Sequence, residues 1–125
     1  MTTTVRTRFA PSPTGFFHIG NLRTALYSYA LAKRYRGTFV LRIEDTDKKR
    51  FVEGAIENLI QIISEFGIDY DEGPTKGGKY GPYVQSERLE IYKQKDEELV
   101  ERGYAYYCFL TQEEVSELRI DKKIA

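Results

Sequence analysis

The feature that most restricts the fold of this chain is the alternation of strand and helix patterns near its start. Residues 4–10 partly alternate between polar and apolar side chains and run into a proline-rich loop, which predicts a strand. Apolar residues at helical spacing follow, with Asn21 as the expected N-cap and Gly37 as the expected end. Residues 38–43 are β-branched and aromatic, which is typical of a buried strand.

A second helix pattern follows the sequence EDTDKKR and ends at Gly67. Its apolar positions are expected on one face: Ile56, Leu59, Ile60, Ile63 and Phe66. The order strand, helix, strand, helix predicts a βαβ unit and therefore an α/β fold with a parallel sheet and flanking helices. A parallel sheet of two strands is not a stable domain, so we expect the chain to be the front portion of a longer protein.

The remaining residues predict a loop followed by helices and one more strand. Residues 69–83 are rich in glycine and proline, and we expect Ser86 to cap a charged helix that ends near Arg102. Residues 104–110, YAYYCFL, predict a strand. The sequence TQEE at 111–114 predicts a capping box that opens a last helix.

Composition excludes several classes of protein. With 41% hydrophobic and 14% aromatic residues, the chain can build a core, so it is not intrinsically disordered. No apolar run reaches the about 20 residues that span a membrane, and a single cysteine, Cys108, cannot form an internal disulfide. We expect a cytoplasmic protein without membrane contact.

The net charge of zero hides an asymmetry along the chain. Residues 1–43 contain seven lysines and arginines and no acidic residue, whereas the remaining residues are acidic in balance. This division suggests that the first third binds a negative group such as phosphate or carboxylate. Solvated, unpaired surface charge is an equally simple explanation.

Two loops should lie together at the carboxyl ends of the predicted strands, where open α/β sheets bind ligands. The first is APSPTGFFHIGN at 10–21 and the second is EDTD at 44–47. A helix N-terminus suits phosphate, and Gly15 and Gly20 would let a ligand approach the backbone. Other polar groups of this region are Arg8, Ser12, Thr14 and His18.

These loops resemble known sequences. RFAPSPTGFFHIGN followed by LRIEDTD closely resembles the catalytic domain of the glutamyl-tRNA synthetases, a branch of the class I aminoacyl-tRNA synthetases. HIGN matches the class signature His-Ile-Gly-His except at its last position, Asn21, which varies in this branch. The stretches YDEGP, GPYVQSERLEIY and ERGYAYYCF are similar to the same family, so the resemblance covers residues 6–118.

The resemblance implies a fold and a division of the chain. Residues 1–84 would form the N-terminal half of a Rossmann-like catalytic domain, and residues 85–125 the beginning of an inserted α/β subdomain that binds the tRNA acceptor end. It also implies binding residues. Arg8 would bind the side-chain carboxylate of L-glutamate, Glu44 its ammonium group, and the other pocket residues would be Ala10 and Ser12.

For ATP, the resemblance implies that His18 contacts the phosphates and stabilises charge at the α-phosphorus, while Gly20 lets adenine lie against the helix start; these two are the expected catalytic residues. The ATP-binding set is Thr14, Gly15, His18, Gly20 and Asn21. Each residue also has a simpler explanation. Arg8 could be an exposed strand residue, Glu44 a partner of Arg42, and Ser12 a turn former. Asp45 or Asp47 could cap the second helix.

The implied enzyme is a monomeric glutamate–tRNA ligase that uses ATP and Mg²⁺, L-glutamate and tRNA(Glu). The lysine-rich KMSKS-type loop and the anticodon-binding region are not found in this sequence, and the C-terminal DKKIA does not replace that loop. We therefore expect the isolated chain to bind ligands weakly and not to turn over. The Cys-x-Cys pair that opens a zinc site in many bacterial relatives is reduced to Cys108, so we expect no zinc, and we assign no residue of this sequence as a metal ligand.

Three alternatives remain. The first is a short paralogue that glutamylates a modified tRNA base, although PTG and RIEDTD resemble the synthetase more closely. The second is a non-catalytic nucleotide-binding fragment, and the third is a small-molecule nucleotidyltransferase, which would not account for RIEDTD or Arg8. The sequence alone does not distinguish enzymes that charge only their cognate tRNA from those that charge others.

Overall fold

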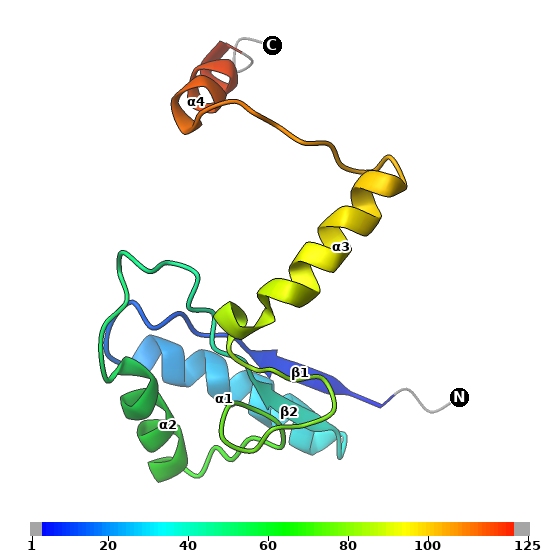
Figure 1. Cartoon of the computed structure of the whole chain (residues 1–125). Helices are drawn as coiled ribbons and strands as arrows, with labels where there is room; N and C mark the ends of the chain where they lie inside the picture. Colours follow the sequence, from blue (N-terminus) through cyan, green and yellow to red (C-terminus); the bar gives the residue numbers. More distant parts are fainter. Residues whose placement is uncertain (1–3, 122–125) are drawn as a thin grey trace. The chain divides into compact units, whose positions relative to one another are not determined.

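The computed structural model describes residues 4–121 of the chain. The elements, in chain order, are β1 (Arg6–Phe9), α1 (Ile19–Arg34), β2 (Thr38–Leu41), α2 (Ala55–Glu65), the 3-10 helix η1 (Gln85–Arg88), α3 (Leu89–Glu101) and α4 (Gln112–Asp121) (Figure 1). The chain divides into two compact units, the first ending at Leu89 and the second beginning at Glu90.

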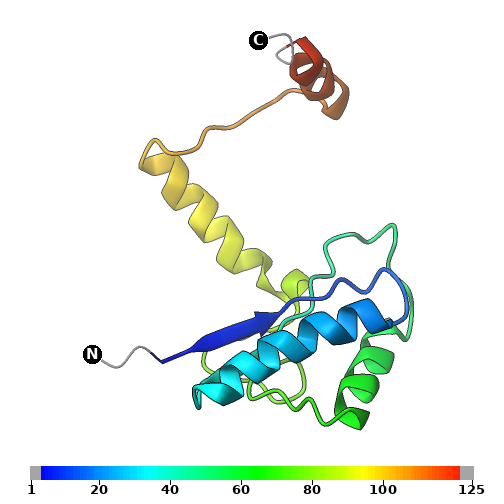
Figure 2. The same cartoon turned by 180° about the vertical axis from the view of Figure 1, so that it is seen from behind.

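The first unit contains the predicted βαβ arrangement. Strands β1 and β2 pair in parallel, with Arg6 opposite Thr38 and Phe9 opposite Leu41, and α1 connects them (Figure 2). The chain returns twice to the free edge of this second strand and its continuation, through parallel bridges from Glu72 to Val40 in β2 and from Val84 to Ile43 just beyond it. The predicted α/β class with a parallel sheet and flanking helices is therefore confirmed.

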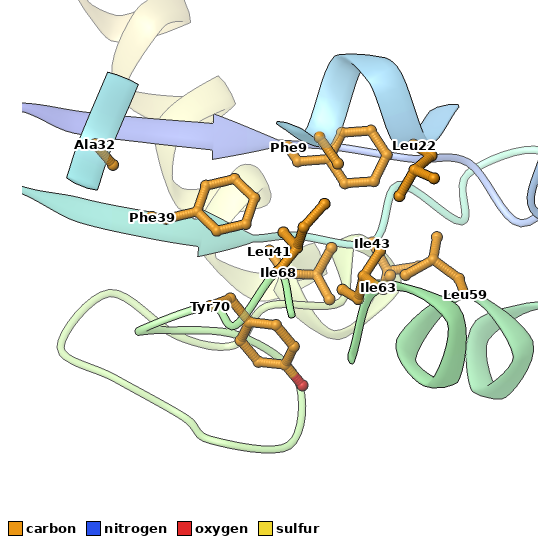
Figure 3. Close-up of a cluster of buried hydrophobic side chains, with 11 residues drawn as sticks. Phe9, Leu22, Ala32, Phe39, Leu41, Ile43, Leu59, Ile63, Ile68 and Tyr70 are labelled. Carbon is orange, nitrogen blue, oxygen red and sulfur yellow. The ribbon is translucent and has the colours of Figure 1, made fainter. Parts of the chain in front are cut away.

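Side chains from β1, β2, α1 and α2 meet in one hydrophobic core (Figure 3). The buried members of this core are Phe9, Leu22, Ala25, Ala32, Phe39, Leu41, Ile43, Leu59, Ile63, Ile68 and Tyr70. Successive side chains of a strand point to opposite faces of the sheet. Because both helices join the face that carries Phe9 and Phe39, the alternate positions Arg6, Arg8 and Arg42 are left on the other face.

The ends of α1 differ from the prediction. The helix begins at Ile19 and not after Asn21, because the His18 side chain acts as N-cap: its Nδ1 accepts a hydrogen bond from the Gly20 N–H at 3.2 Å. The helix ends at Arg34. Gly37 follows, and a Cβ there would lie 2.1 Å from the Val5 carbonyl oxygen, so glycine is required by close packing.

The start and end of α2 also correct the sequence analysis. Its N-cap is Gly54, with a left-handed φ of 78° and no side-chain cap, so neither Asp45 nor Asp47 caps this helix. Phe66, expected on the buried face, is 63% exposed because it follows the last helical turn.

The predicted cap of the next helix is also wrong. Ser86 lies inside η1, and α3 begins at Leu89. The Ser86 side chain has another partner, described below.

In the second unit, the strand predicted at 104–110 is not formed. Within the described residues 4–121 this segment pairs with no other strand, and Tyr106 and Phe109 are 84% and 91% exposed. An isolated strand leaves its backbone groups unpaired, so β-propensity alone does not produce one. The capping box is confirmed, because Thr111 and Glu114 exchange hydrogen bonds between side chain and backbone N–H.

Among the described residues, the helices are too short or too polar for any of them to span a bilayer.

Candidate active site

The two loops singled out in the sequence lie side by side at the carboxyl ends of β1 and β2. The Glu44 N–H donates to the Pro11 carbonyl at 2.9 Å, and the Val52 N–H donates to the Pro13 carbonyl at 3.0 Å. Both prolines are buried. Proline lacks an N–H and has a fixed φ, so these positions offer rigid carbonyl acceptors without an unpaired buried donor. The prolines therefore hold the first loop against the second.

Arg8 and Glu44, the two residues expected to recognise the amino acid, lie close together. Arg8 Nη2 is 3.8 Å from Glu44 Oε1, and Arg42 Nη2 is 3.4 Å from the same oxygen. The Arg8 side chain is 50% exposed and that of Arg42 is 22% exposed. Arg8 is thus partly exposed and Arg42 is a partner of Glu44, as the simpler explanations had it. The three side chains form one cluster of charges at the ligand edge of the sheet.

His18 and Gly20 form the start of α1. Because Nδ1 of His18 accepts the Gly20 N–H, the neutral imidazole carries its proton on Nε2, which leaves that N–H to donate elsewhere. His18 is exposed. A Cβ on Gly20 would lie 3.0 Å from Cε1 of His18, so glycine at this position gives the ring its room. The geometry presents one imidazole donor beside the positive end of a helix.

The other predicted residues of the first loop line the same edge. Ala10 and Thr14 are half-buried, whereas Ser12 and Gly15 are exposed. Open space surrounds Gly15, since a Cβ there would meet no atom within 4 Å. The predicted ATP-binding residue Asn21 lies in the first turn of α1, and its N–H donates to the His18 carbonyl at 2.9 Å.

A cavity of about 510 Å³ opens on the face of the sheet that carries Arg8. Its lining residues are Arg6, Thr7, Arg8, Val40, Arg42, Tyr80, Tyr83 and Arg88. Four guanidinium groups make this lining basic, which agrees with the basic character of the first third of the sequence. Such a lining suits a ligand with carboxylate or phosphate groups.

One wall of the cavity is fixed by an ion pair. Nη1 and Nη2 of Arg6 donate to Oε1 and Oε2 of Glu72, both at 2.5 Å, and the Tyr83 hydroxyl donates to the same carboxylate. The hydrogen bonds from Arg6, and next those from Tyr83, lower the pKa of Glu72 from 4.5 to about 2. The Arg6 guanidinium also lies over the Tyr80 ring, 4.7 Å from its centroid. The positive charge of Arg6 is therefore compensated by Glu72 within the wall, whereas Arg8 and Arg42 lie nearer the loops.

No group of three or more histidine, cysteine, aspartate and glutamate side chains suited to a metal ion occurs in the part of the chain that the structure describes. The expected absence of zinc stays a prediction.

Sequence reasoning missed several residues of this region. The cavity residues Tyr80 and Tyr83 come from a loop that the glycine and proline content had marked only as irregular. Asp45 was considered as a helix cap, but its carboxylate accepts hydrogen bonds from Ser86. Asp45 and Ser86 are 41 residues apart, so no short-range sequence pattern indicates that they form a pair.

A parallel sheet with loops and a helix N-terminus at its carboxyl edge places this chain in the α/β class that binds ligands at that edge. Comparison with known proteins narrows this class. The family model of the class I tRNA synthetases (E and Q), catalytic domain, matches residues 4–125. The chain therefore belongs to this family and has the fold of its catalytic domain, of which it forms a part.

Individual relatives agree. The glutamate–tRNA ligase of Chlorobium phaeobacteroides is 61% identical over 114 residues, which cover 91% of this chain and 23% of that protein. That of Clostridium botulinum is 55% identical, covering 98% and 25%. The crystal structure of a glutamate tRNA ligase from Elizabethkingia meningosepticum in complex with its amino acid has a TM-score of 0.86 at 47% identity, covering 98% and 24%. The chain thus spans about a quarter of the length of these relatives.

Proposed function

We propose that the protein to which this chain belongs is a glutamate–tRNA ligase, an aminoacyl-tRNA synthetase of the cytoplasm. It would activate L-glutamate with ATP to glutamyl-adenylate and then transfer the glutamyl group to the 3′ end of tRNA(Glu). The observation that carries this proposal is the pairing of Arg8 with Glu44, 3.8 Å apart at the ligand edge of the sheet. One cation and one anion so placed match an amino acid that bears an ammonium group and an additional carboxylate.

The amino-acid site is built from the two loops. The Arg8 guanidinium would bind the side-chain carboxylate of glutamate in a bidentate manner. The Glu44 carboxylate would take the ammonium group, while Ala10 and Ser12 would line the pocket between them. Arg8 is the more exposed of the two arginines at Glu44 and has the longer contact, so the substrate can draw it away while Arg42 keeps Glu44 in place.

The nucleotide site lies at the start of α1. His18 would donate from Nε2 to the phosphates and stabilise the charge that develops at the α-phosphorus. Gly20 would leave room for adenine, and Thr14, Gly15 and Asn21 would complete the floor. Magnesium entering with ATP would neutralise phosphate charge. An α-carboxylate oxygen of glutamate forms a bond to the α-phosphorus as the bond to the pyrophosphate oxygen breaks, so no covalent enzyme intermediate is required.

The remaining parts of the function concern the whole protein. Residues 1–84 would belong to the nucleotide-binding domain, and residues 85–125 would begin the insert that binds the tRNA acceptor end. The full-length protein would be a monomer that also carries a lysine-rich loop and an anticodon-binding region. The 125-residue chain alone would bind ligands weakly and not turn over, since the phosphate contacts of the lysine-rich loop would be missing from it.

The test is ATP–pyrophosphate exchange and tRNA charging by the full-length gene product. We expect exchange with glutamate but not with glutamine, and charging of tRNA(Glu) at its 3′ end. In Arg8→Gln the preference for glutamate should be lost, because a neutral amide does not pair with a carboxylate. Glutamylation of a modified base in the tRNA in place of its 3′ end would refute the proposal.

A further inference from the structure

The loop that carries Glu44 lies between two other segments of the chain. On one side, the N–H groups of Arg42 and Glu44 donate to the carbonyls of Phe9 and Pro11, at 3.0 and 2.9 Å. On the other side, Ile43 donates to the Tyr83 carbonyl and accepts from the Gln85 N–H, both at 2.9 Å. The alternation is that of a strand, so the loop continues the sheet beyond the end of β2.

Next to these backbone bonds, the side chain of Asp45 continues the contact with the segment that contains Gln85 and Ser86. The Ser86 N–H donates to Oδ1 of Asp45 at 2.8 Å, and the Ser86 hydroxyl donates to Oδ2 at 2.6 Å. Both carboxylate oxygens are thus used by a residue 41 positions away in the sequence. Both side chains are half-buried. Burial acts to raise the pKa of Asp45, but the hydrogen bonds from Ser86 outweigh it and hold the pKa below its ordinary value.

We propose that Asp45 and Ser86 are positioning residues for the amino-acid site. Together they fix the outer side of the loop and thereby set where the Glu44 carboxylate meets the ammonium group of the substrate. The proposal rests on the proposed function, and adds to it a link between the site and η1. Neither residue needs to touch a ligand: Asp45 follows Glu44 directly, so a shift at Asp45 moves the backbone from which the Glu44 side chain projects.

The same loop contains a matched control. The Asp47 carboxylate accepts from the N–H and the Nε of Arg50, at 3.2 and 2.6 Å, and both bonds lie within one turn of the loop. Asp47 therefore has the same chemistry as Asp45, two residues away, without a bond to a distant segment. If a carboxylate in this loop mattered only for local folding or charge, the two aspartates would behave alike.

The test measures glutamate-dependent ATP–pyrophosphate exchange by the full-length gene product, with and without tRNA, at varied glutamate and at varied ATP. We expect Asp45→Ala and Ser86→Ala to raise the KM for glutamate about tenfold, as removal of supporting hydrogen bonds does at other sites. The KM for ATP should change less than twofold. Ser86→Thr keeps the hydroxyl and should restore most of the lost affinity, and Asp47→Ala should resemble the wild type.

The double variant Asp45→Ala/Ser86→Ala should be no worse than either single variant, because both remove the same link. Equal effects of Asp45→Ala and Asp47→Ala, or a fall in kcat with both KM values unchanged, would overturn the proposal and leave a structural role. If Asp45→Ala does not fold, Ser86→Ala and Ser86→Thr decide the question by the same criteria. Absence of exchange in the wild type both with and without tRNA would instead refute the proposed function, a result distinct from an unchanged KM in the variants.

Discussion

The N–H of Glu44 donates to the carbonyl of Pro11 at 2.9 Å, and this bond joins the two loops that form the candidate site. It places Glu44, which is expected to bind the ammonium group, beside the loop that contains Ala10 and Ser12, which are expected to line the rest of the glutamate pocket. The bond uses backbone atoms only, so a change of the Glu44 side chain leaves it intact. Function at this position can therefore be tested without dismantling the loop.

The close approach of Gly37 to the strand end predicts a large effect of a small change. A Cβ in Gly37→Ala would lie 2.1 Å from the Val5 carbonyl oxygen and 2.9 Å from the Val5 carbonyl carbon, both rigid backbone atoms. We expect a loss of about 1–3 kcal/mol in the free energy of unfolding, measured by denaturant titration of the full-length gene product. Gly15→Ala is the control: open space surrounds it, so its stability should stay within about 0.5 kcal/mol.

The ion pair of Arg6 with Glu72 predicts a pH dependence. The pKa of Glu72 is lowered from 4.5 to about 2, so its contribution to stability is complete above pH 4.5 and is lost as the pH falls to about 2. Glu72→Gln should reduce the free energy of unfolding at pH 7 by about 1–3 kcal/mol. The variant should also lose less stability than the wild type between pH 4.5 and 2. Parallel acid curves for the two proteins would contradict this assignment.

The partners of Asp71 and Asp69 differ, and we therefore expect removal of these two carboxylates to have different effects on stability. Its side chain accepts the N–H of Phe39 at 2.7 Å and the Lys33 ammonium at 2.9 Å. Asp71→Ala removes the acceptor of an N–H in the buried strand β2, so we expect a loss of about 1–3 kcal/mol in thermal or denaturant unfolding. Asp69 is 76% exposed and forms a surface ion pair with Lys76, so Asp69→Ala should cost at most about 0.5 kcal/mol. Equal losses would show that Asp71 acts by charge alone.

Much of the first unit could be predicted from the sequence because its signals are local. Apolar spacing and the glycines gave α1 and α2, and the β-branched run 38–43 gave β2, although the structure ends that strand at Leu41. The position of the site followed from topology, since loops after parallel strands meet at one edge. The roles of Arg8, His18 and Glu44 came from a family resemblance and remain proposals.

The misses have two physical causes. The cap of α1 was placed at Asn21 because asparagine is a good cap, yet the histidine before the helix does the same with Nδ1. The strand expected at 104–110 has β-propensity but pairs with no other strand among residues 4–121. Ser86 satisfies Asp45 and caps no helix. The His18 cap is a contact with a residue two positions away, and it was missed because histidine is not a usual N-cap. The other two outcomes depend on whether a distant partner is present, which short-range patterns do not specify.

The most direct test of the central claim is glutamate-dependent ATP–pyrophosphate exchange by the full-length gene product, comparing wild type, His18→Ala and His18→Asn. Asparagine can keep the hydrogen bond that caps α1 but lacks the Nε2 donor, so it separates folding from phosphate contact. We predict that exchange falls about 100-fold or more in both variants, with the His18→Asn protein folded as the wild type. Exchange at the wild-type rate in His18→Asn would contradict the claim and reduce His18 to a helix cap.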